Sequence, residues 1–441
     1  MSAIARYFLQ KGAKVSGYDR TETTITRALE SEGASIHYED NFKLIDKNTD
    51  LVIYTPAIPK DHREWNWLKN NGYEIVKRSD VLQWITEGGF NICVAGTHGK
   101  TSITSMIGYL LRHGPGCNAF LGGVSVNFGT NYWKAENNIN VVEADEYDRS
   151  FLKLSPDIAV ITAMDADHLD IYGTVENMRQ NFVEFGKRII QDGLLIHKIG
   201  LDQLDQLTGI DIRKYALENR AENGPEIYAE NIRNITGGYL FDAVLGETKI
   251  NDVELHTGGL HNLENMLVAM AVATHLGMEP ETLKDAIRVY QGVVRRFEYI
   301  LKPSEGNENG PVVIDDYAHH PEELRALLRG AKDLFPGHRC FIVFQPHLFT
   351  RTRDLANEFA EVLNIADEVY LLPIYPAREL PIEGISSEVI AEKIPAGKVK
   401  LTTGQEWFEK WTPVDGEMWL LAGAGNIDVL APLVKNKYVK N

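Results

Sequence analysis

Residues 94–101, Val-Ala-Gly-Thr-His-Gly-Lys-Thr, combine glycines, a lysine and a hydroxyl in a pattern that binds phosphate. They follow the apolar run 90–94 and precede residues 103–111, whose apolar spacing predicts an amphipathic helix. In a strand, glycine turn and helix, backbone N–H groups converge on phosphate oxygens, the lysine adds a positive charge, and the next hydroxyl binds Mg²⁺. We therefore predict a nucleotide site formed by Gly96, Thr97, His98, Gly99, Lys100, Thr101 and Ser102.

This motif is the shorter Gly-Thr-x-Gly-Lys-Thr form, because Val94 stands where the general phosphate-loop pattern has its first glycine. The alternative is an ordinary strand, turn and helix with a surface lysine. The positions of Lys100 and Thr101 directly after the second glycine favour the nucleotide site.

Two acidic segments follow predicted strands further along the chain. Residues 138–142 lead into Glu-Ala-Asp-Glu-Tyr-Asp at 143–148, and residues 157–162 lead into Met-Asp-Ala-Asp-His-Leu-Asp at 164–170. A hard cation takes oxygen ligands and offsets the repulsion between crowded carboxylates, so Glu143 is a predicted Mg²⁺ ligand. His168 is predicted to reach a metal or a phosphate. Solvated acidic turns and an exposed histidine are the alternatives.

Other polar groups have weaker signals. Asn262 and Asn265 precede or begin a strong helix and could place amides at a purine edge, although Asn is also a common helix cap. The pair Arg295-Arg296 suits phosphate clamping at a domain junction, or it is simply solvated. Asp19 ends a predicted strand, where it could bind a ribose hydroxyl or lie in an exposed turn.

The last third of the chain places polar loops after two predicted strands. Residues 312–314 precede Asp-Asp-Tyr-Ala-His-His-Pro at 315–321, and residues 340–344 precede a loop at 345–354 that contains Arg-Thr-Arg. Loops after parallel strands lie at one edge of the sheet. The acid–Tyr–His–His loop and the Arg-x-Arg loop are therefore expected to face the same edge.

Strands and helices alternate along the chain, which predicts an α/β protein with parallel sheets. The length of 441 residues favours two or three domains. We predict a Rossmann-like N-terminal domain at 1–89, a central P-loop ATPase-like domain at 90–294, and a Rossmann-like C-terminal domain at 295–441. A strand and a glycine-rich turn should precede the helix that starts at Ser2, and we expect the N-terminal domain to lack them.

Composition narrows the class of partner. The chain is 44% hydrophobic and 24% charged, and its net charge of −17 disfavours nucleic acid and acidic membranes as partners. Three cysteines without paired metal-ligand spacing fit a reducing compartment. Without a secretion signal or an apolar run of membrane-spanning length, the protein is expected in the cytoplasm.

Taken together, the motifs resemble those of the Mur ligases, the ATP-dependent amide-forming enzymes of peptidoglycan precursor synthesis and hence of cell-wall biogenesis, cell shape and cell division. The resemblance covers essentially the whole chain, and the complete set in register is specific although no single motif is. The motifs that carry it are residues 96–101, 143–146, 167–168, 261–262, 295–297, 315–321, 345–347, 350–354 and 423–425.

The resemblance implies a UDP-sugar domain, a central ATPase domain, and a C-terminal domain that brings the amino acid and closes over ATP. The motifs are most similar to those of the member that joins L-alanine to UDP-N-acetylmuramate. In that reaction ATP phosphorylates the sugar carboxylate, the amine attacks the acyl phosphate, and a tetrahedral intermediate collapses to amide and phosphate. A monomer or weak homodimer is expected.

The resemblance also implies residue roles. Lys100 screens the γ-phosphate, one Mg²⁺ binds at Thr101 and Glu143, and a second binds at His168. The remaining assignments are His261, Asn262 and Asn265 to adenine, Arg296 to phosphate, Asp316 and Tyr317 to the nucleotide, His319, Arg351 and Arg353 to the amino acid and developing charge, and Asp19 and Thr55 to the UDP-sugar.

Two departures from the family pattern affect these expectations. The family begins with a strand and a Gly-x-Gly-Gly-x-Gly turn that lead into Met1-Ser2, and we expect their absence to weaken UDP-sugar binding, as in a truncated sequence. Leu348 stands where several relatives carry an arginine, which removes one anion contact.

Three alternatives remain open. A recycling ligase that attaches a murein tripeptide to the same UDP-sugar shares the ATP motifs, although residues 345–354 favour the alanine enzyme. A folylpolyglutamate synthetase shares the phosphate loop but should lack the Asp-Asp-Tyr-x-His-His-Pro segment. A non-ligase P-loop nucleotide switch would not need the His and Arg loops of the last third.

Overall fold

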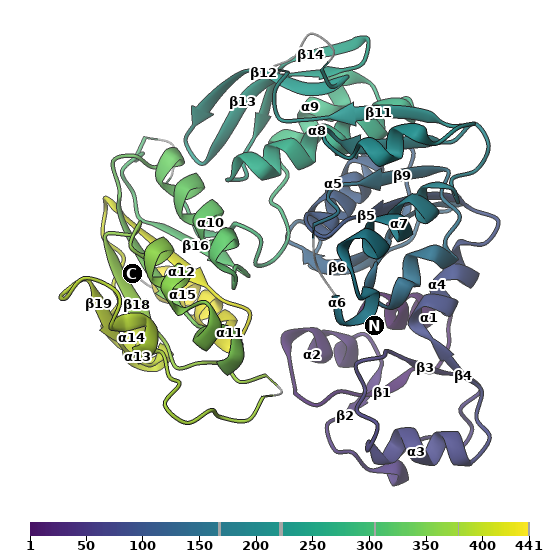
Figure 1. The fold of residues 1–441 in the computed structure, drawn as a ribbon, viewed down its shortest axis with the longest axis horizontal. Coiled ribbons are helices and arrows are strands. Elements are labelled where there is room, and N and C mark those ends of the chain that lie inside the picture. Colours follow the sequence, from purple (N-terminus) through teal and green to yellow (C-terminus); the bar gives the residue numbers. More distant parts are fainter. Residues whose placement is uncertain (166–168, 220–223, 304–305, 378, 440–441) are drawn as a thin grey trace.

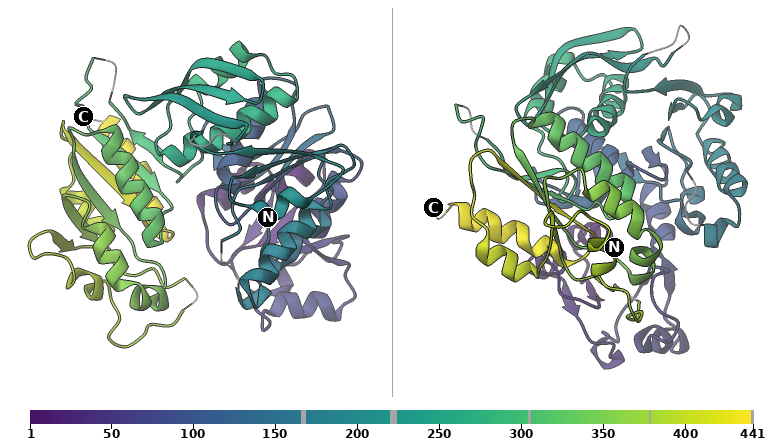
Figure 2. Two further views of the ribbon diagram at one scale, coloured as in Figure 1. Left: turned by 45° about the horizontal axis from the view of Figure 1, so that its top comes forward. Right: turned by 60° about the vertical axis from the view of Figure 1, so that its left-hand side comes forward.

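The computed structural model describes residues 1–165, 169–219, 224–303, 306–377 and 379–439. The fold is a three-domain α/β architecture with a helix-flanked sheet in each of the two larger domains. Figure 1 shows the N-terminal elements beside one end of the central domain and the C-terminal elements to one side of it. The two further views in Figure 2 show the same arrangement.

The N-terminal elements follow the predicted alternation of strands and helices, but they form two separate parallel pairs, β1–β2 and β3–β4. The α/β alternation and the parallel pairing are as predicted, but the strands divide into two two-stranded sheets. Each strand has only three residues, so each pair offers few ladder hydrogen bonds. The elements are α1 (Ser2–Gln10), β1 (Ser16–Tyr18), α2 (Thr24–Ser31), β2 (Ser35–His37), β3 (Val52–Tyr54), α3 (Arg63–Asn70), β4 (Ile75–Lys77) and α4 (Arg78–Thr86).

Helix α1 fastens these elements to the central domain. The Arg6 guanidinium donates to the Glu32 carboxylate and, over 2.5 Å, to the side-chain oxygen of Asn131 in the central sheet. Lys77 and Arg78 form ion pairs with Asp148 and Asp145 of the acidic segment after β8. The N-terminal elements therefore rest on the same loop that borders the phosphate site.

The central domain is built on a ten-stranded sheet of order β14-β13-β12-β11-β10-β9-β5-β8-β6-β7. Strand β5 lies between β9 and β8 and is parallel to both, whereas β12, β13 and β14 pair antiparallel. The strands are β5 (Phe90–Ala95), β6 (Asn118–Ser125), β7 (Thr130–Trp133), β8 (Ile139–Glu143), β9 (Ile158–Ile161), β10 (Leu194–Lys198), β11 (Asp211–Tyr215), β12 (Ile227–Ile235), β13 (Gly238–Leu245) and β14 (Thr248–Leu255).

Successive side chains of β5 point to opposite faces of the sheet, and helices pack against both faces. Ile92 and Val94 pack with α5 and α8 in one core, and Cys93 and Ala95 pack with α7 in another. All four side chains are fully buried. The helices are α5 (Lys100–Arg112), α6 (Leu169–Tyr172), α7 (Val175–Gly186), α8 (Leu260–His275) and α9 (Pro280–Arg288).

The C-terminal domain has a six-stranded sheet of order β15-β16-β20-β17-β18-β19, parallel except for β15. Helices α10, α12 and α13 cover one face, and α14 and α15 cover the other. The elements are β15 (Glu298–Leu301), β16 (Val312–Asp316), α10 (Pro321–Leu334), β17 (Arg339–Phe344), α11 (Phe349–Asp354), α12 (Ala356–Leu363), β18 (Glu368–Leu371), α13 (Glu388–Ala391), β19 (Val399–Leu401), α14 (Gly404–Lys410), β20 (Glu417–Ala422) and α15 (Leu430–Val439).

Helix α10 begins where its sequence signals place the start. Pro321 occupies the first turn, and the Glu323 carboxylate accepts from the backbone N–H groups of His319 and His320. This start fixes the loop after β16 at the C-terminal edge of the sheet. In the described part of the chain, no helix is both long and apolar enough to span a membrane.

Candidate active site

The predicted phosphate loop lies between β5 and α5, where two glycines permit its path. Gly96 has φ 130°, and a Cβ there would collide with the Thr162 hydroxyl at the end of β9. Gly99 has φ 79° and begins α5 in the left-handed region that favours glycine. The first backbone N–H groups of α5 have no partner within the helix and are available to an anion.

Lys100 is held by two oxygens of the central domain. Its ammonium donates to the Gly96 carbonyl over 2.6 Å and to Glu146 Oε1 over 2.7 Å. Glu146 is almost fully buried, and its Oε2 has no hydrogen-bond partner among the described residues. Burial raises the pKa of Glu146, and the Lys100 charge opposes that rise. Sequence reasoning assigned no role to Glu146, although it lies in the acidic segment already singled out.

Glu143 and Thr101 are brought together, as predicted for a Mg²⁺ site. The Gly122 N–H donates to Glu143 Oε1 over 2.8 Å, and the Thr101 hydroxyl also hydrogen-bonds the carboxylate. Burial raises the pKa of Glu143, and these two bonds lower it. A Cβ at Gly122 would collide with the Glu143 carboxylate, so glycine is required where this acid lies against β6. His168 lies outside the described residues.

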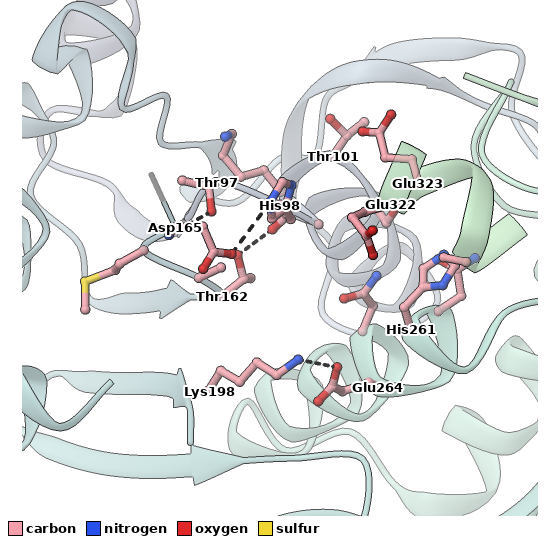
Figure 3. Close-up of a pocket in the computed structure, with 18 of the residues that line it drawn as sticks. Thr97, His98, Thr101, Thr162, Asp165, Lys198, His261, Glu264, Glu322 and Glu323 are labelled. Carbon is pink, nitrogen blue, oxygen red and sulfur yellow. Dashed lines mark hydrogen bonds and ion pairs between the residues drawn. The ribbon is translucent and has the colours of Figure 1, made fainter. Parts of the chain in front are cut away.

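A cavity of about 810 Å³ connects the loop to two other parts of the chain. Residues 97–102 line one part of it, α8 contributes His261 and Asn265, and the C-terminal domain contributes Arg296 and α10 (Figure 3). His261 is exposed at the cavity wall. Partial removal from water by the surrounding protein, aided by the charges of Arg296 and Lys198, lowers its pKa to about 4. The cavity is large enough for a nucleoside triphosphate.

The side chains of the two asparagines of α8 already have contacts within the protein. The Asn262 amide donates to the Gly258 carbonyl over 2.8 Å and is almost fully buried. Asn265 Oδ1 lies against Gly99, 3.3 Å from the position a Cβ would take there. The helix cap weighed from the sequence is not formed by either asparagine, because Gly259 is the N-cap of α8 and no side chain caps it. Asn265 is placed beside the phosphate loop.

Asp316 and Tyr317 organise the linker into the C-terminal domain. The Asp316 carboxylate accepts from the backbone N–H groups of Phe297 and Ala318, each over 2.7 Å. Burial raises the pKa of Asp316, and these bonds with Arg296 lower it. The Arg295 and Arg296 guanidiniums lie 5.1 and 5.5 Å from the Tyr317 ring centroid. Asp316 and Arg296 line the cavity, and their nucleotide roles stay predictions.

The two polar loops of the C-terminal domain meet at one sheet edge, as predicted. The His319 and His347 ring centroids lie 5.8 Å apart, and His347 stacks on Tyr375. Burial, with the charges of His319 and Arg351, lowers the pKa of His347 to about 4. His347 Nδ1 and Arg351 Nη1 are buried without a hydrogen-bond partner among the described residues.

A residue missed by sequence reasoning, Glu379, supports this edge. Its Oε2 accepts from the Thr350 N–H over 3.0 Å, and its Oε1 bonds the Thr350 hydroxyl, which fixes the start of α11. Arg351 lies in α11 next to Thr350. The 29-residue separation between Thr350 and Glu379 gives no local signal that could reveal the contact.

Several predicted residues do not line the cavity. Glu143, Tyr317, His319 and Arg351 lie outside its lining, and so do Arg353, Asp19 and Thr55. Arg353 is half exposed and pairs with Asp354 over 2.7 Å. Asp19 Oδ1 accepts from the Thr21 N–H, which is the exposed-turn alternative, and the Thr55 hydroxyl lies 3.5 Å from the Ala57 N–H. The roles of these residues in binding or catalysis stay predictions.

Comparison with known proteins accounts for the three parts of the chain. Residues 1–89 match the catalytic domain of the Mur ligase family, residues 94–273 match the Mur ligase middle domain, and residues 295–425 match the Mur ligase glutamate ligase domain. A UDP-N-acetylmuramate–L-alanine ligase from Parabacteroides distasonis is 45% identical over 443 residues, which cover 99% of this chain and 94% of that protein.

Two solved structures are similar over the whole chain. A UDP-N-acetylmuramate–alanine ligase from Thermotoga maritima has a TM-score of 0.83 at 25% identity and covers 100% of this chain and 96% of its own. A murein peptide ligase from Psychrobacter arcticus has a TM-score of 0.68 at 21% identity, with 99% and 96% covered. The second likeness shows the fold alone.

Proposed function

The chain belongs to the Mur ligase family, and we propose that it joins L-alanine to the carboxylate of UDP-N-acetylmuramate with ATP as the second substrate. The observation that carries this proposal is the shared cavity. Lys100 and the first turn of α5 line it from the central domain, and Arg296 and α10 line it from the C-terminal domain. A ligase needs both, because the activated carboxylate must meet an amine delivered by another domain.

The proposed first step transfers the γ-phosphoryl group of ATP to the sugar carboxylate, with ADP as leaving group. Both reactants are anions, so positive charge must lie between them. The N–H groups of the first turn of α5 and the Lys100 ammonium supply it. For Lys100 to reach the phosphate, its bond to Glu146 must be exchanged for one to the nucleotide, or shared with it.

Mg²⁺ fits the donor set at this end of the cavity. Thr101 and Glu143 present oxygen ligands side by side, and burial leaves the Glu143 carboxylate in need of a positive partner. The described residues contain no group of three or more His, Cys, Asp or Glu side chains that could hold a metal, so phosphate and water oxygens would complete the shell. When bound, the ion would neutralise charge that develops on the phosphates.

The proposed second step is attack of the alanine amine on the acyl phosphate carbonyl, which releases phosphate. Arg351 Nη1 is a suitable partner for the alanine carboxylate. The neutral imidazole of His347 can accept a hydrogen bond from the alanine ammonium as it loses its proton.

We also propose residues 1–89, 90–294 and 295–441 as the three domains that these steps require.

Phosphate release from ATP tests the proposal. We expect release to require both UDP-N-acetylmuramate and L-alanine, with a product whose mass equals the sugar nucleotide plus one alanyl residue. Substitution of alanine by the murein tripeptide should give little product. Faster turnover with the tripeptide would favour the recycling ligase, and release that ignores every added amino acid would rule out both ligases.

A further inference from the structure

A histidine and a glutamate lie one helical turn apart at the start of α10. His319 precedes the helix, and Glu323 is in its first turn. Glu323 Oε2 lies 3.4 Å from His319 Nδ1, and Glu323 also lines the cavity that contains the phosphate loop (Figure 3). The same carboxylate oxygen accepts from the backbone N–H groups of His319 and His320, so it caps the helix as well. No step proposed above uses Glu323.

The contacts of His319 determine which of its ring nitrogens carries a proton. Nδ1 lies 3.0 Å from the Tyr317 carbonyl oxygen, which can only accept, so Nδ1 is the donor. In the neutral imidazole, Nε2 is then the acceptor and can take a second proton. The Glu323 carboxylate beside Nδ1 stabilises the imidazolium that results, because opposite charges attract strongly at this distance.

Polar and charged groups from the neighbouring elements act on this imidazole. Burial lowers the pKa of His319 most, and the Glu323 carboxylate and the Tyr317 carbonyl raise it. The charges of Arg351 and Arg296 lower the pKa further. Glu323 is the carboxylate in this set, so its charge limits the loss of basicity that burial and the two arginines cause.

The pair lies between the two ends of the site. Glu323 is at the wall of the cavity that a nucleotide would occupy, and the His319 ring centroid is 5.8 Å from that of His347. The amine must cross this space to reach the activated carboxylate. The pKa of His347 is about 4, so His347 can orient the amine but is too weak a base to hold its proton at neutral pH. His319, with a carboxylate beside it, is the better proton acceptor.

We propose that His319 takes the proton from the alanine ammonium, and that Glu323 is the positioning residue that orients this imidazole and stabilises its charged form. The inference rests on the proposed function for the identity of the amine. One proton passes from the ammonium to His319 Nε2, and the freed nitrogen lone pair attacks the carbonyl carbon of the acyl phosphate. The bond from that carbon to the phosphate oxygen breaks, with its electron pair on the phosphate. The nitrogen gives its second proton to the departing phosphate, and the imidazolium returns its proton to water.

Glutamine at position 323 separates the charge from the helix cap. A glutamine side chain also accepts a backbone N–H at this position of a capping box, so α10 should keep its start in Glu323→Gln while the negative charge is lost. The matched control is Glu406→Gln. Glu406 has the same place in the capping box of α14, where its carboxylate accepts from the Thr403 N–H over 3.0 Å.

The first measurement is the pKa of His319 in the free chain, by NMR titration with ¹³C-labelled histidine and with His319→Gln to assign the signal. We expect Glu323→Gln to lower this pKa by about one pH unit, and Glu406→Gln to leave it unchanged. The second measurement is the pH profile of kcat/KM for L-alanine, whose acidic limb reports the base in the free enzyme. In Glu323→Gln this limb should move to lower pH, and the maximum should fall by about tenfold because the base is weaker.

His319→Gln provides the answer if Glu323→Gln does not fold. It should remove the acidic limb and lower the maximal kcat/KM for L-alanine by about a hundredfold or more, with little change in the Kd for ATP. Retention of the limb in this variant would overturn the proposal.

An unchanged His319 pKa in folded Glu323→Gln would also overturn the proposal and leave Glu323 as a helix cap only. The NMR titration contains no substrate, so it does not depend on ligase activity. A lowered pKa in a chain that forms no alanyl product supports the role of Glu323 and contradicts only the proposed function. A chain that forms the product while the pKa and the acidic limb stay unmoved contradicts this inference alone.

Discussion

The two parts of the site hold their basic side chains in opposite ways. In the central domain, Lys100 is already paired, with the buried Glu146 carboxylate and the Gly96 carbonyl. In the C-terminal domain, Arg351 Nη1 and His347 Nδ1 are buried with no hydrogen-bond partner among the described residues. At the phosphate end the lysine charge is already balanced by a protein carboxylate. At the amino-acid end, buried polar atoms have no protein partner among the described residues and can bind a ligand.

This difference has an energetic meaning. A ligand at Lys100 must compete with an internal carboxylate, so part of its binding free energy is offset by the ion pair that it disturbs. A ligand at Arg351 replaces no protein partner and gains a charge-assisted hydrogen bond directly. We therefore expect the affinity for the nucleotide to change when Glu146 is substituted. The affinity for the amino acid should depend on Arg351 itself.

The largest effect is expected for Lys100→Ala. Loss of the ammonium proposed to screen the transferred phosphate should lower kcat by about a thousandfold or more. Steady-state phosphate release measures it, with circular dichroism to verify the fold and Lys249→Ala, from an exposed ion pair, as the control. Turnover near the wild-type rate would show that this end of the site is not catalytic.

A smaller effect, confined to the amino acid, is expected for Arg351→Ala. The KM for L-alanine should rise by about a hundredfold, because a carboxylate loses its charge-assisted partner, while the KM for ATP changes little. Arg353→Ala is the matched control, since Arg353 is half exposed and paired with Asp354, and it should change either KM by less than about threefold. A larger effect of Arg353→Ala would restore the role expected from its sequence position and weaken the contrast drawn here.

Glu146→Gln sharpens the comparison at the phosphate end. Without the buried negative charge, Lys100 is released at lower cost, so the Kd for ATP should fall by about three- to tenfold. The less well-oriented lysine should at the same time lower kcat. Equilibrium ATP binding and single-turnover kinetics separate the two effects. Weaker ATP binding in this variant would mean that Glu146 assists the nucleotide and does not compete with it.

The smallest effect on turnover is expected at Asp315 in β16, whose contribution is to stability. Burial, opposed by Arg295 3.6 Å away, raises the pKa of Asp315 from 3.8 to about 7. A raised carboxyl pKa means that the folded state binds the proton more tightly than the unfolded state. The free energy of unfolding should therefore fall as the pH rises from about 4 to 7, by at most about 4 kcal/mol from this group.

Denaturant unfolding of the wild type and Asp315→Asn between pH 5 and 8 measures this contribution. The variant should lose the part of the pH dependence that Asp315 causes, so the difference in unfolding free energy between the two proteins should change steadily with pH. Parallel pH profiles would show that Asp315 does not change its protonation on unfolding in this range.

Most elements and the phosphate loop were predictable because their signals are local. The glycine spacing around Lys100 and Thr101 identified the loop, and apolar runs identified β5, β8, β9, β16 and β17 within a few residues. The pairing of β1–β2 and β3–β4 into two separate sheets was not predictable, because strands of three residues carry too little pattern to fix their neighbours.

The sequence by itself determined the chemistry of the site: glycines that allow a close backbone approach, a lysine and hydroxyl for phosphate, and histidine and arginine loops after parallel strands. Only the tertiary structure decided which charges meet. Glu146 lies 46 residues from Lys100, and Glu264 lies 66 residues from Lys198. Strand order and helix packing bring these partners together. The separation of the two residues along the chain does not predict whether a lysine is ion-paired or free.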